Sequence, residues 1–344
     1  MKTKATSLDI AYQAGVSQST VSRALRNSPL VNEETRKKIH ALAKELNYKV
    51  DKNASNLRSQ HTGTLALLLF EDPTSDDSMI NPFFLSMLGC ITRAAAKNGY
   101  DLLVSFQQLS EDWHADYEDA SKADGLILLG YGDYVDYEDK LKQLNEQETH
   151  FVRYGTIEEG QTGVSLGCDN FSGGYQMTQH LISLGYQTFA FLGGADEHCP
   201  EFKDRYLGHC KALREANIKI VPHNQIDAIS TEGSGFSAAN QLIQQHNLPE
   251  AVFCASDMIA VGALTAFQKQ GINVPKQVAL AGFDDIQVAH LTSPELTTMQ
   301  QNTKLAAEVL VESLIKKIHD LPVESALIPA KLIIRESCGG KPNG

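Results

Sequence analysis

Residues 6–25 read TSLDIAYQAGVSQSTVSRAL, a stretch that predicts two short helices separated by a tight turn. Thr6 and Asp9 have the spacing of a capping box, in which each side chain accepts a hydrogen bond from the other residue's backbone amide. Gly15 supplies the left-handed backbone conformation that commonly ends a helix. Ser17 has the residue type and the position to cap a second helix. This order of caps predicts a helix-turn-helix unit.

The second predicted helix has two chemically different faces. Val21, Ala24 and Leu25 recur at helical spacing and form an apolar stripe for packing. The other face carries amide, hydroxyl and guanidinium groups, on Gln18, Ser19, Ser22, Arg23 and Arg26. Such groups match the donors and acceptors on base edges in the DNA major groove. We therefore interpret this helix as one that reads bases; the alternative interpretation is an ordinary pair of surface helices.

A third predicted helix, residues 33–46, follows a capping Asn32 and carries an apolar face on which the first two helices can pack. Four sequence blocks in this region resemble those of LacI-type (lactose and purine repressor) transcriptional regulators: AGVS at 14–17, TVSR at 20–23, EETR at 33–36 and ELNY at 45–48. The resemblance extends from about residue 6 to Ser337. It implies a sequence-specific DNA-binding transcriptional regulator, which in this family is usually a repressor.

The helix faces and the resemblance together assign the predicted DNA contacts. Arg23 and Gln18 are expected to read bases, whereas residues at the two helix starts are placed for phosphates, because free backbone amides there attract anions. The full set is Thr6, Ser7, Ser17, Gln18, Ser19, Thr20, Ser22, Arg23, Asn32, Ala54 and Leu57. One chain supplies a single recognition helix and operator half-sites lie about one helical turn apart, so we expect a homodimer on palindromic double-stranded operator DNA.

Residues 49–62 are predicted to form a hinge between two domains. Residues 53–58 make barely two helical turns, fewer than the roughly 12–15 residues that an isolated helix needs in water. The resemblance implies that this helix forms only on DNA and that Leu57 is wedged into the minor groove, where the bent DNA offsets the cost of unstacking bases. A stray leucine in a linker is the alternative. Val50 and Asp51 depart from the residues that the family usually has at their positions.

Charge is divided unequally along the 344 residues. The net charge is −12, yet residues 1–62 contain eleven Lys and Arg against five Asp and Glu, a net of +6 that leaves −18 for the rest. A basic head on an acidic body is typical of a phosphate-binding module joined to a domain with another role. No apolar run reaches the ~18 residues of a membrane span, the polar N-terminus is unlike a signal peptide, and the six cysteines lack CxxC spacing. We expect a cytoplasmic protein with reduced thiols.

From Thr64 onward, short apolar runs alternate with segments of helical period, which predicts parallel sheets covered by helices on both faces. The predicted strands are 65–70, 102–105, 125–129, 151–153, 164–168, 189–192, 251–254, 278–281 and 296–299, and the predicted helices are 83–98, 172–184, 206–216, 235–246 and 257–270. The resemblance implies that an α/β periplasmic-binding-protein-like effector domain of two doubly wound subdomains follows the all-α DNA-binding domain, residues 1–48. The implied subdomains are residues 63–163 with 291–322, and residues 164–290 with 323–341.

Ligands of such sheets bind beyond the carboxyl ends of the strands. This rule points to Asn81, Phe83, Tyr154, Arg205, Ser256, Asp284 and Gln301. The resemblance independently implies effector contacts at five of these positions: Phe83, Arg205, Ser256, Asp284 and Gln301. A guanidinium, a carboxylate and an aromatic ring that share one cleft suit a polyhydroxylated ligand. A mono- or disaccharide is therefore the predicted effector, and a carbohydrate-utilisation operon is the predicted target.

Several of these residues have structural alternatives. Asp257 could simply cap its helix, Asp285 could form a structural ion pair, and Phe83 could belong to the hydrophobic core. Ser256 stands where the family commonly has asparagine, which weakens that predicted contact.

Other functional classes find little support in the sequence. Its glycine pairs lack the GxGxxG spacing of dinucleotide sites, its adjacent His–Cys pairs lack zinc-site spacing, and it has no GxSxG elbow. The sequence therefore predicts no cofactor, no metal site and no enzyme. Two alternatives stay open: the same fold with a purine-like corepressor, and a sugar-binding or sugar-modifying protein without a DNA function.

Overall fold

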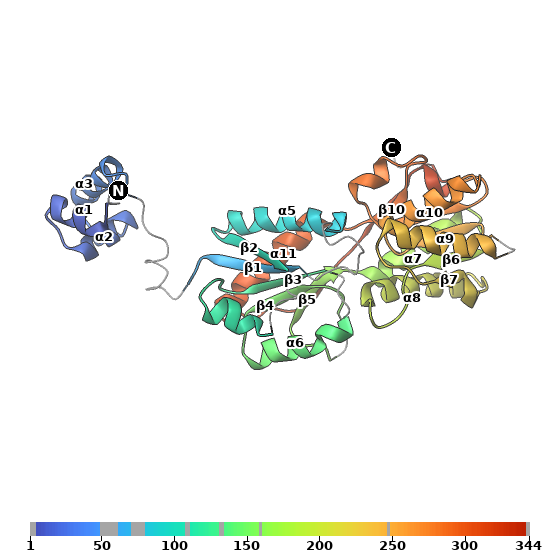
Figure 1. Ribbon diagram of the computed structural model, residues 1–344, viewed down its shortest axis with the longest axis horizontal. Coiled ribbons are helices and arrows are strands. Elements are labelled where there is room, and N and C mark those ends of the chain that lie inside the picture. The colour runs from blue at the N-terminus through green and yellow to red at the C-terminus, as the bar shows by residue number, and fades with distance from the viewer. Residues whose placement is uncertain are drawn as a thin grey trace. The chain divides into compact units, whose positions relative to one another are not determined.

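The computed structural model describes residues 5–48, 61–69, 80–106, 111–130, 134–157, 160–245 and 248–341. The chain divides into two compact units, residues 1–62 and 63–344. Within the described residues, the first unit contains helices and no strand, and the second contains both helices and strands (Figure 1). The predicted hinge helix, with its contacts Ala54 and Leu57, lies outside the described residues.

The described part of the first unit is built from three helices whose apolar faces meet in one small core. The helices are α1 (Ser7–Ala14), α2 (Gln18–Leu25) and α3 (Glu33–Glu45). The buried core side chains are Ile10, Ala11, Ala14, Val21, Ala24, Val31, Ile39 and Ala43. Because the apolar stripe of α2 is used in this core, the polar face of α2 is left to solvent.

The predicted caps of these helices are confirmed. Thr6 and Asp9 form the reciprocal capping box at the start of α1, and Gly15 ends that helix with φ 72°. Ser17 and Asn32 accept backbone hydrogen bonds at the starts of α2 and α3. The starts of these helices are therefore set by side chains that accept hydrogen bonds from the backbone amides left unpaired in a first helical turn.

The second unit contains two six-stranded sheets, each at the centre of one lobe (Figure 1). The first lobe holds the sheet with the order β11-β5-β4-β3-β1-β2. Its strands are β1 (Thr64–Leu69), β2 (Asp101–Phe106), β3 (Leu126–Leu129), β4 (Phe151–Tyr154), β5 (Val164–Cys168) and β11 (Ala326–Ile328). Its helical elements are α5 (Pro82–Lys97), the π-helical turn η1 (Ala115–Asp119), α6 (Tyr134–Glu146) and α11 (Thr303–Ile318). In β1, Leu65 and Leu67 pack in the cluster of α5 and α11, whereas Ala66 and Leu68 pack in that of η1 and α6, as a strand covered on both faces requires.

The second lobe holds the sheet with the order β12-β10-β9-β8-β6-β7. Its strands are β6 (Phe189–Leu192), β7 (Gln225–Ile226), β8 (Ala251–Cys254), β9 (Ala279–Asp284), β10 (Thr297–Gln300) and β12 (Lys331–Ile333). Its α-helices are α7 (Asn170–Ser183), α8 (Pro200–Glu215), α9 (Glu232–Gln244) and α10 (Asp257–Lys269), of which α7 packs on α8 and α9 on α10. Short helical turns lie at η2 (Pro222–Asn224), η3 (Gln287–His290) and η4 (Glu336–Cys338).

The chain crosses between the lobes at different points from those predicted. Residues 164–168 were assigned to the second subdomain but form β5 of the first sheet, and residues 297–300 were assigned to the first but form β10 of the second. Residues 326–328 form β11 beside β5, so the last crossover follows β11 instead of lying near residue 322. The sheet of the second lobe is not purely parallel either, because β12 runs antiparallel to β10.

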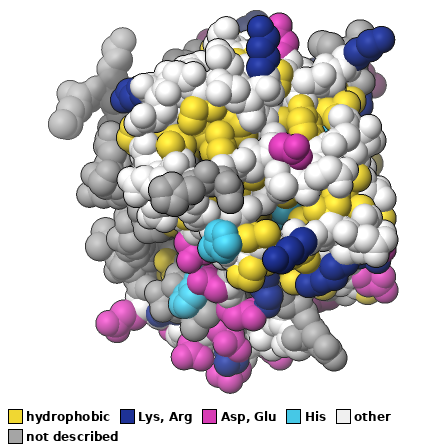
Figure 2. All heavy atoms as spheres, turned by 90° about the vertical axis from the view of Figure 1, so that its right-hand side faces the viewer, with side chains coloured by type: hydrophobic (Ala, Val, Ile, Leu, Met, Phe, Trp, Pro, Cys, Tyr) yellow, Lys and Arg dark blue, Asp and Glu magenta, His cyan; other side chains and the backbone are white. Residues whose placement is uncertain are grey.

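No described helix is long and apolar enough to cross a membrane. All six cysteines are free thiols, and four of them are buried. The end of the second lobe carries acidic and histidine side chains in the lower part of the view and scattered hydrophobic side chains above them (Figure 2).

Candidate functional site

The described part of the predicted DNA-binding face consists of side chains that are all at least partly exposed. Its hydroxyl and amide groups are organised by short hydrogen bonds. Gln18 Nε2 donates to Ser7 Oγ at 2.8 Å, which ties α2 to the start of α1. Ser17 Oγ lies 2.8 Å from both Ser19 Oγ and Thr20 Oγ1. The structure therefore gathers five of the predicted contacts at the adjacent starts of α1 and α2.

Two arginines, Arg23 on α2 and Arg26 just past its end, differ in the contacts of their side chains. Arg26 folds back along its helix, with Nη2 2.7 Å from Ser22 Oγ and Nε 3.3 Å from the Ser22 carbonyl. Arg23 is exposed, and its side chain makes no hydrogen bond or ion pair with any described residue. Its guanidinium fork is thus available for bidentate contact with a base or a phosphate. Asn32, also predicted to contact DNA, uses its Oδ1 to cap α3 through Thr35 N at 2.8 Å.

All seven predicted effector residues are buried, and they lie where the carboxyl ends of both sheets face each other. We call these residues the interlobe junction: Asn81, Phe83, Tyr154, Arg205, Ser256, Asp284 and Gln301. The first lobe supplies Asn81 and Phe83 at the start of α5 and Tyr154 at the end of β4. The second lobe supplies Arg205 on α8, Ser256 as the cap of α10 and Asp284 at the end of β9. Gln301 follows β10, where the chain crosses back to the first lobe.

A continuous chain of polar contacts crosses the junction. Tyr154 Oη donates to Gln301 Oε1, and Gln301 Nε2 donates to Asp284 Oδ1 at 2.6 Å. The same carboxylate oxygen lies 3.6 Å from Arg205 Nη1. These contacts connect the end of a first-lobe strand to a second-lobe helix through buried donors and acceptors. A change in the separation of the lobes must therefore break or replace at least one of them.

Arg205 is fixed more firmly than its neighbours. Its guanidinium stacks 3.8 Å above the ring of Phe283, its Nε donates to Asn170 Oδ1 at 2.8 Å, and Nη1 donates to the Ala255 carbonyl. The helix itself is held close to α7, because a Cβ atom at Gly174 would lie only 2.1 Å from the Arg205 carbonyl oxygen. Asn170 was not predicted, although its position just past the end of β5 satisfies the carboxyl-end rule.

A second set of hydrogen bonds joins the lobes. Asn81 Nδ2 donates to Ser230 Oγ at 2.9 Å, and Ser230 Oγ donates to Ser256 Oγ at 2.8 Å. Asn81 Oδ1 also accepts from Phe83 N at 2.9 Å and so caps α5. The Phe83 ring is only 1% exposed and packs 5.9 Å from the Tyr154 ring. Phe83 thus belongs to the first-lobe core while it borders the junction.

A third contact, between Thr156 and Asp204, was not predicted. Thr156 Oγ1, two residues beyond β4, donates to Asp204 Oδ2 on α8 at 2.6 Å. Glu201, one turn earlier on α8, lies against Gly155, because a Cβ atom there would be 3.2 Å from Glu201 Oε1. Burial raises the pKa of both carboxyl groups. The position of Asp204 next to Arg205 was the available signal, but an acidic residue in a helix is usually a surface residue.

The two other aspartates at the carboxyl ends are structural. Ser256, and not Asp257, caps α10, which overturns the capping interpretation of Asp257. The Asp257 carboxylate instead accepts from Thr298 Oγ1 at 2.6 Å and from Ile286 N at 2.9 Å. Asp285 forms an ion pair with Arg335 at 2.5 Å, as its structural interpretation predicted.

Asp284 has the electrostatic and backbone features of a ligand-contacting residue. Burial raises the pKa of its carboxyl group to about 6, although Arg205 and the Gln301 amide oppose the shift. Its φ of 118° is uncommon for a residue with a side chain, and such conformations cluster at ligand sites. No described residue forms a hydrogen bond with its second carboxylate oxygen. Asp284 therefore has an acceptor to offer.

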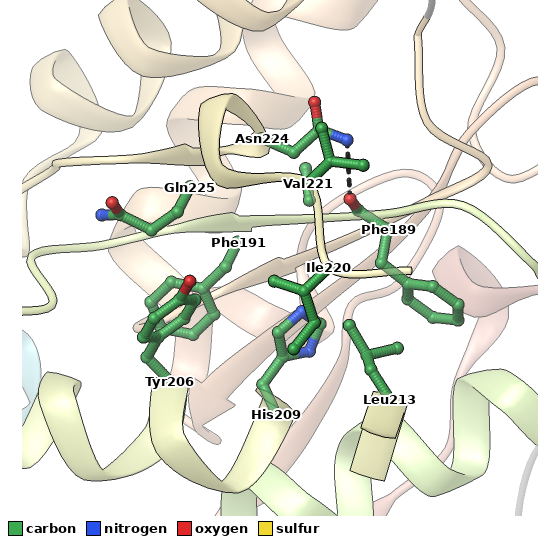
Figure 3. A pocket seen from close by; sticks show the side chains of 10 residues that line it. Phe189, Phe191, Tyr206, His209, Leu213, Ile220, Val221, Asn224 and Gln225 are labelled. Carbon is green, nitrogen blue, oxygen red and sulfur yellow. Dashed lines mark hydrogen bonds between the residues drawn. The ribbon is translucent and has the colours of Figure 1, made fainter. Parts of the chain in front are cut away.

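A separate small cavity lies in the second lobe, between β6, α8 and the segment from Ile220 to Gln225 (Figure 3). His209 and Tyr206 line it, together with Phe191 and Asn224, whose Nδ2 donates to the Phe189 carbonyl at 2.9 Å. Its volume of about 10 Å³ corresponds to roughly one water molecule. No predicted effector residue lines it. The described residues contain no group of three or more side chains able to hold a metal ion.

Comparison with known proteins gives matches along nearly the whole chain. Residues 6–51 match the family described as bacterial regulatory proteins, lacI family, and residues 178–338 match the periplasmic binding protein-like domain. The HTH-type transcriptional regulator RegA of Clostridium saccharobutylicum is 32% identical over 336 residues, which cover 96% of this chain and 98% of RegA. The HTH-type transcriptional repressor PurR of Pasteurella multocida is 28% identical, over 97% of this chain and 98% of PurR.

Among solved structures, a complex of the transcriptional regulator CelR with cellobiose is similar, with a TM-score of 0.72 and 27% identity over 97% of this chain and 99% of CelR. The similarity covers both the helix-turn-helix unit and the two lobes. The relatives are DNA-binding transcriptional regulators and not enzymes.

Proposed function

The chain belongs to the lacI family of bacterial regulatory proteins, and we propose that a sugar bound in the interlobe junction controls its affinity for operator DNA. The observation that carries this proposal is the buried polar chain from Tyr154 through Gln301 and Asp284 to Arg205. Its amide, carboxylate and guanidinium groups are those that bind vicinal hydroxyls. A sugar that took over these partners would change which arrangement of the lobes is most stable.

Control requires a ligand whose affinity differs between the two arrangements. In the structure two hydrogen bonds of the junction cross between the lobes, from Tyr154 to Gln301 and from Asn81 to Ser230. A ligand that inserts between them replaces protein–protein hydrogen bonds by protein–ligand ones, so its binding energy depends directly on lobe separation. The resulting coupling to DNA is expected to be about 1–3 kcal/mol, or roughly 5–150-fold in operator affinity.

The DNA-binding part of the proposal rests on the exposed face of α2. Arg23 and Gln18 read bases, and the hydroxyl groups at the starts of α1 and α2 hold phosphates. Ala54 and Leu57 of the hinge complete the contacts, with Leu57 as the minor-groove wedge. We propose a homodimer, because a palindromic operator needs two recognition helices, and a cytoplasmic location, where its DNA is. A repressor of a carbohydrate-utilisation operon fits these properties.

A purine-like corepressor is the second candidate, favoured by the similarity to PurR. Asp284 and Arg205 could pair with the polar edge of a base. The flat faces of a base need an aromatic partner, and the Phe83 ring is buried in the first-lobe core. This geometry supports a sugar over a purine.

The test is operator binding, followed by fluorescence anisotropy while ligands are added. We expect one or more neutral mono- or disaccharides to release the operator, and purine bases to leave the complex unchanged. Asp284→Asn should bind operator normally and lose the response to sugar. Ser183→Ala, on the second-lobe helix α7 and exposed, serves as the matched control and should respond like the wild type. Tightening by a purine base alone would show that the corepressor function is correct.

A further inference from the structure

We infer that the ligand of the interlobe junction carries no phosphate or carboxylate group and is a neutral, hydroxyl-rich molecule. The inference rests on the proposed function and narrows it to one class of sugar. It follows from the balance of charge around the junction, where the described cations are already engaged and the carboxylates are in excess.

The two arginines beside the junction are held by protein partners. Arg205 stacks on Phe283 and donates to Asn170 and to the Ala255 carbonyl. Arg153, on β4, donates from Nε to Ser165 Oγ at 2.5 Å. Its Nη2 donates to the Thr156 carbonyl at 3.2 Å and to Gln161 Oε1 at 2.5 Å. An anionic ligand would have to take one of these guanidinium groups away from several partners at once.

The one lysine in the first turn of α8 is engaged elsewhere. Lys203 Nζ lies 2.5 Å from both carboxylate oxygens of Glu197, in the loop before the helix. Phosphate recognition in proteins usually relies on arginine forks, lysine ammonium groups or clustered backbone amides. Among the described residues next to the junction, no such cation is left without a protein partner.

Carboxylates, by contrast, are abundant and poorly neutralised. Glu201 and Asp204 form no ion pair with a described residue, and burial raises the pKa of both. Among the described residues, the only cation that contacts the Asp284 carboxylate is Arg205, at 3.6 Å. A phosphate brought close to any of these groups in its ionised form would be repelled, and the low dielectric of a buried junction strengthens that repulsion. Hydroxyl groups donate hydrogen bonds to carboxylates, so the same groups would attract a hydroxyl-rich ligand.

The test uses matched pairs of neutral and phosphorylated probes on the full-length protein. Glucose with glucose 6-phosphate, fructose with fructose 1-phosphate, and hypoxanthine with inosine monophosphate are titrated by calorimetry and by operator release. We expect a neutral sugar to bind and its phosphate to bind at least about 30-fold more weakly. A phosphorylated sugar that binds more tightly than its neutral partner would overturn the charge inference and leave sugar control intact.

Failure of the proposed function has a different signature. If hypoxanthine binds while neither the sugars nor their phosphates do, the proposal of sugar control is wrong. Weaker binding of inosine monophosphate than of hypoxanthine would then still support the exclusion of anionic ligands. Tighter binding of inosine monophosphate would overturn both the sugar proposal and the exclusion of anions.

The source of the discrimination is tested with Glu201→Gln combined with Asp204→Asn. This pair should reduce the preference for the neutral probe by about tenfold, because it removes two carboxylates and keeps the shape of the side chains. Glu215→Gln, at the exposed far end of the same helix, should leave the preference unchanged. Thermal unfolding establishes that each variant is folded. An unchanged preference in the folded double variant would contradict the inference.

Discussion

The predicted DNA-binding face and the interlobe junction contain similar types of side chain, but those of the face are exposed and those of the junction are buried. None of the nine described residues that are predicted to contact DNA is buried, whereas all seven junction residues are. Arg23 and Arg205 show the contrast most clearly. The first is exposed, without a partner among the described residues; the second is 1% exposed, stacked on an aromatic ring and hydrogen bonded.

This difference separates the two tasks of a regulator. An exposed side chain such as Arg23 can engage DNA without first breaking a contact inside the protein, so its contribution depends on which base it meets. A buried network can bind a ligand only by exchanging internal hydrogen bonds, so its occupancy depends on the arrangement of the lobes. Sensing therefore belongs to the second unit and reading to the first.

The largest expected effect tests whether the two units are independent. Ile39 is fully buried in the small three-helix core, and Ile39→Ala should cost about 2–5 kcal/mol, enough to unfold a unit of this size. Operator binding should be lost while the thermal transition of the second unit stays unchanged in calorimetry. Leu310→Ala, fully buried in the first-lobe core, is the matched control and should lower only the second transition. One transition that moves in both variants would mean that the units unfold together.

A smaller effect tests base reading by the exposed face. Arg23→Ala should weaken binding to the cognate operator by about 1–3 kcal/mol and to random DNA by much less, because a base contact carries the sequence information. Lys37→Ala, on the exposed side of α3, should reduce both affinities by a similar small factor and decrease the salt dependence. Fluorescence anisotropy on both DNAs measures this. Equal losses for Arg23→Ala on the two DNAs would show that Arg23 contacts only phosphate.

The sequence was sufficient for the first unit because its structure is local. Each cap lies within three residues of the group that it satisfies, and Thr6, Ser17 and Asn32 all behave as predicted. Most strands of the second unit were also predicted, because their apolar runs are nearly continuous. The strands that were missed, β7, β11 and β12, have only two or three residues each, too few for a pattern.

Strand pairing and side-chain contacts between segments that lie far apart in the sequence could not be predicted from the sequence alone. Both lobes repeat the same strand–helix pattern, so nothing in residues 164–168 shows that β5 pairs with β4 before the chain crosses. The same limit applies to the junction. Asn170, Ser230 and Asp204 are ordinary polar residues until the fold places them against Arg205, Asn81 and Thr156. The family resemblance supplied five of the junction positions, but not the contacts that satisfy them.

The smallest expected effect tests whether burying the ionised Asp284 carboxylate in the junction lowers the stability of the folded protein. Burial raises the pKa of Asp284 to about 6, so the folded protein holds this proton more tightly than the unfolded chain does. The stability that this group contributes is therefore present below about pH 4 and is lost as the pH rises through 6. Asp284→Asn keeps a neutral group at all pH values, so its melting temperature should exceed that of the wild type by a few degrees at pH 8 and by less at pH 5. Asp285→Asn, the neighbouring control, removes one partner of the buried pair with Arg335 and should lower the melting temperature at pH 8. Scanning calorimetry of the three proteins at both pH values measures this. A wild type more stable than Asp284→Asn at pH 8 would show that Arg205 outweighs the cost of burying the carboxylate.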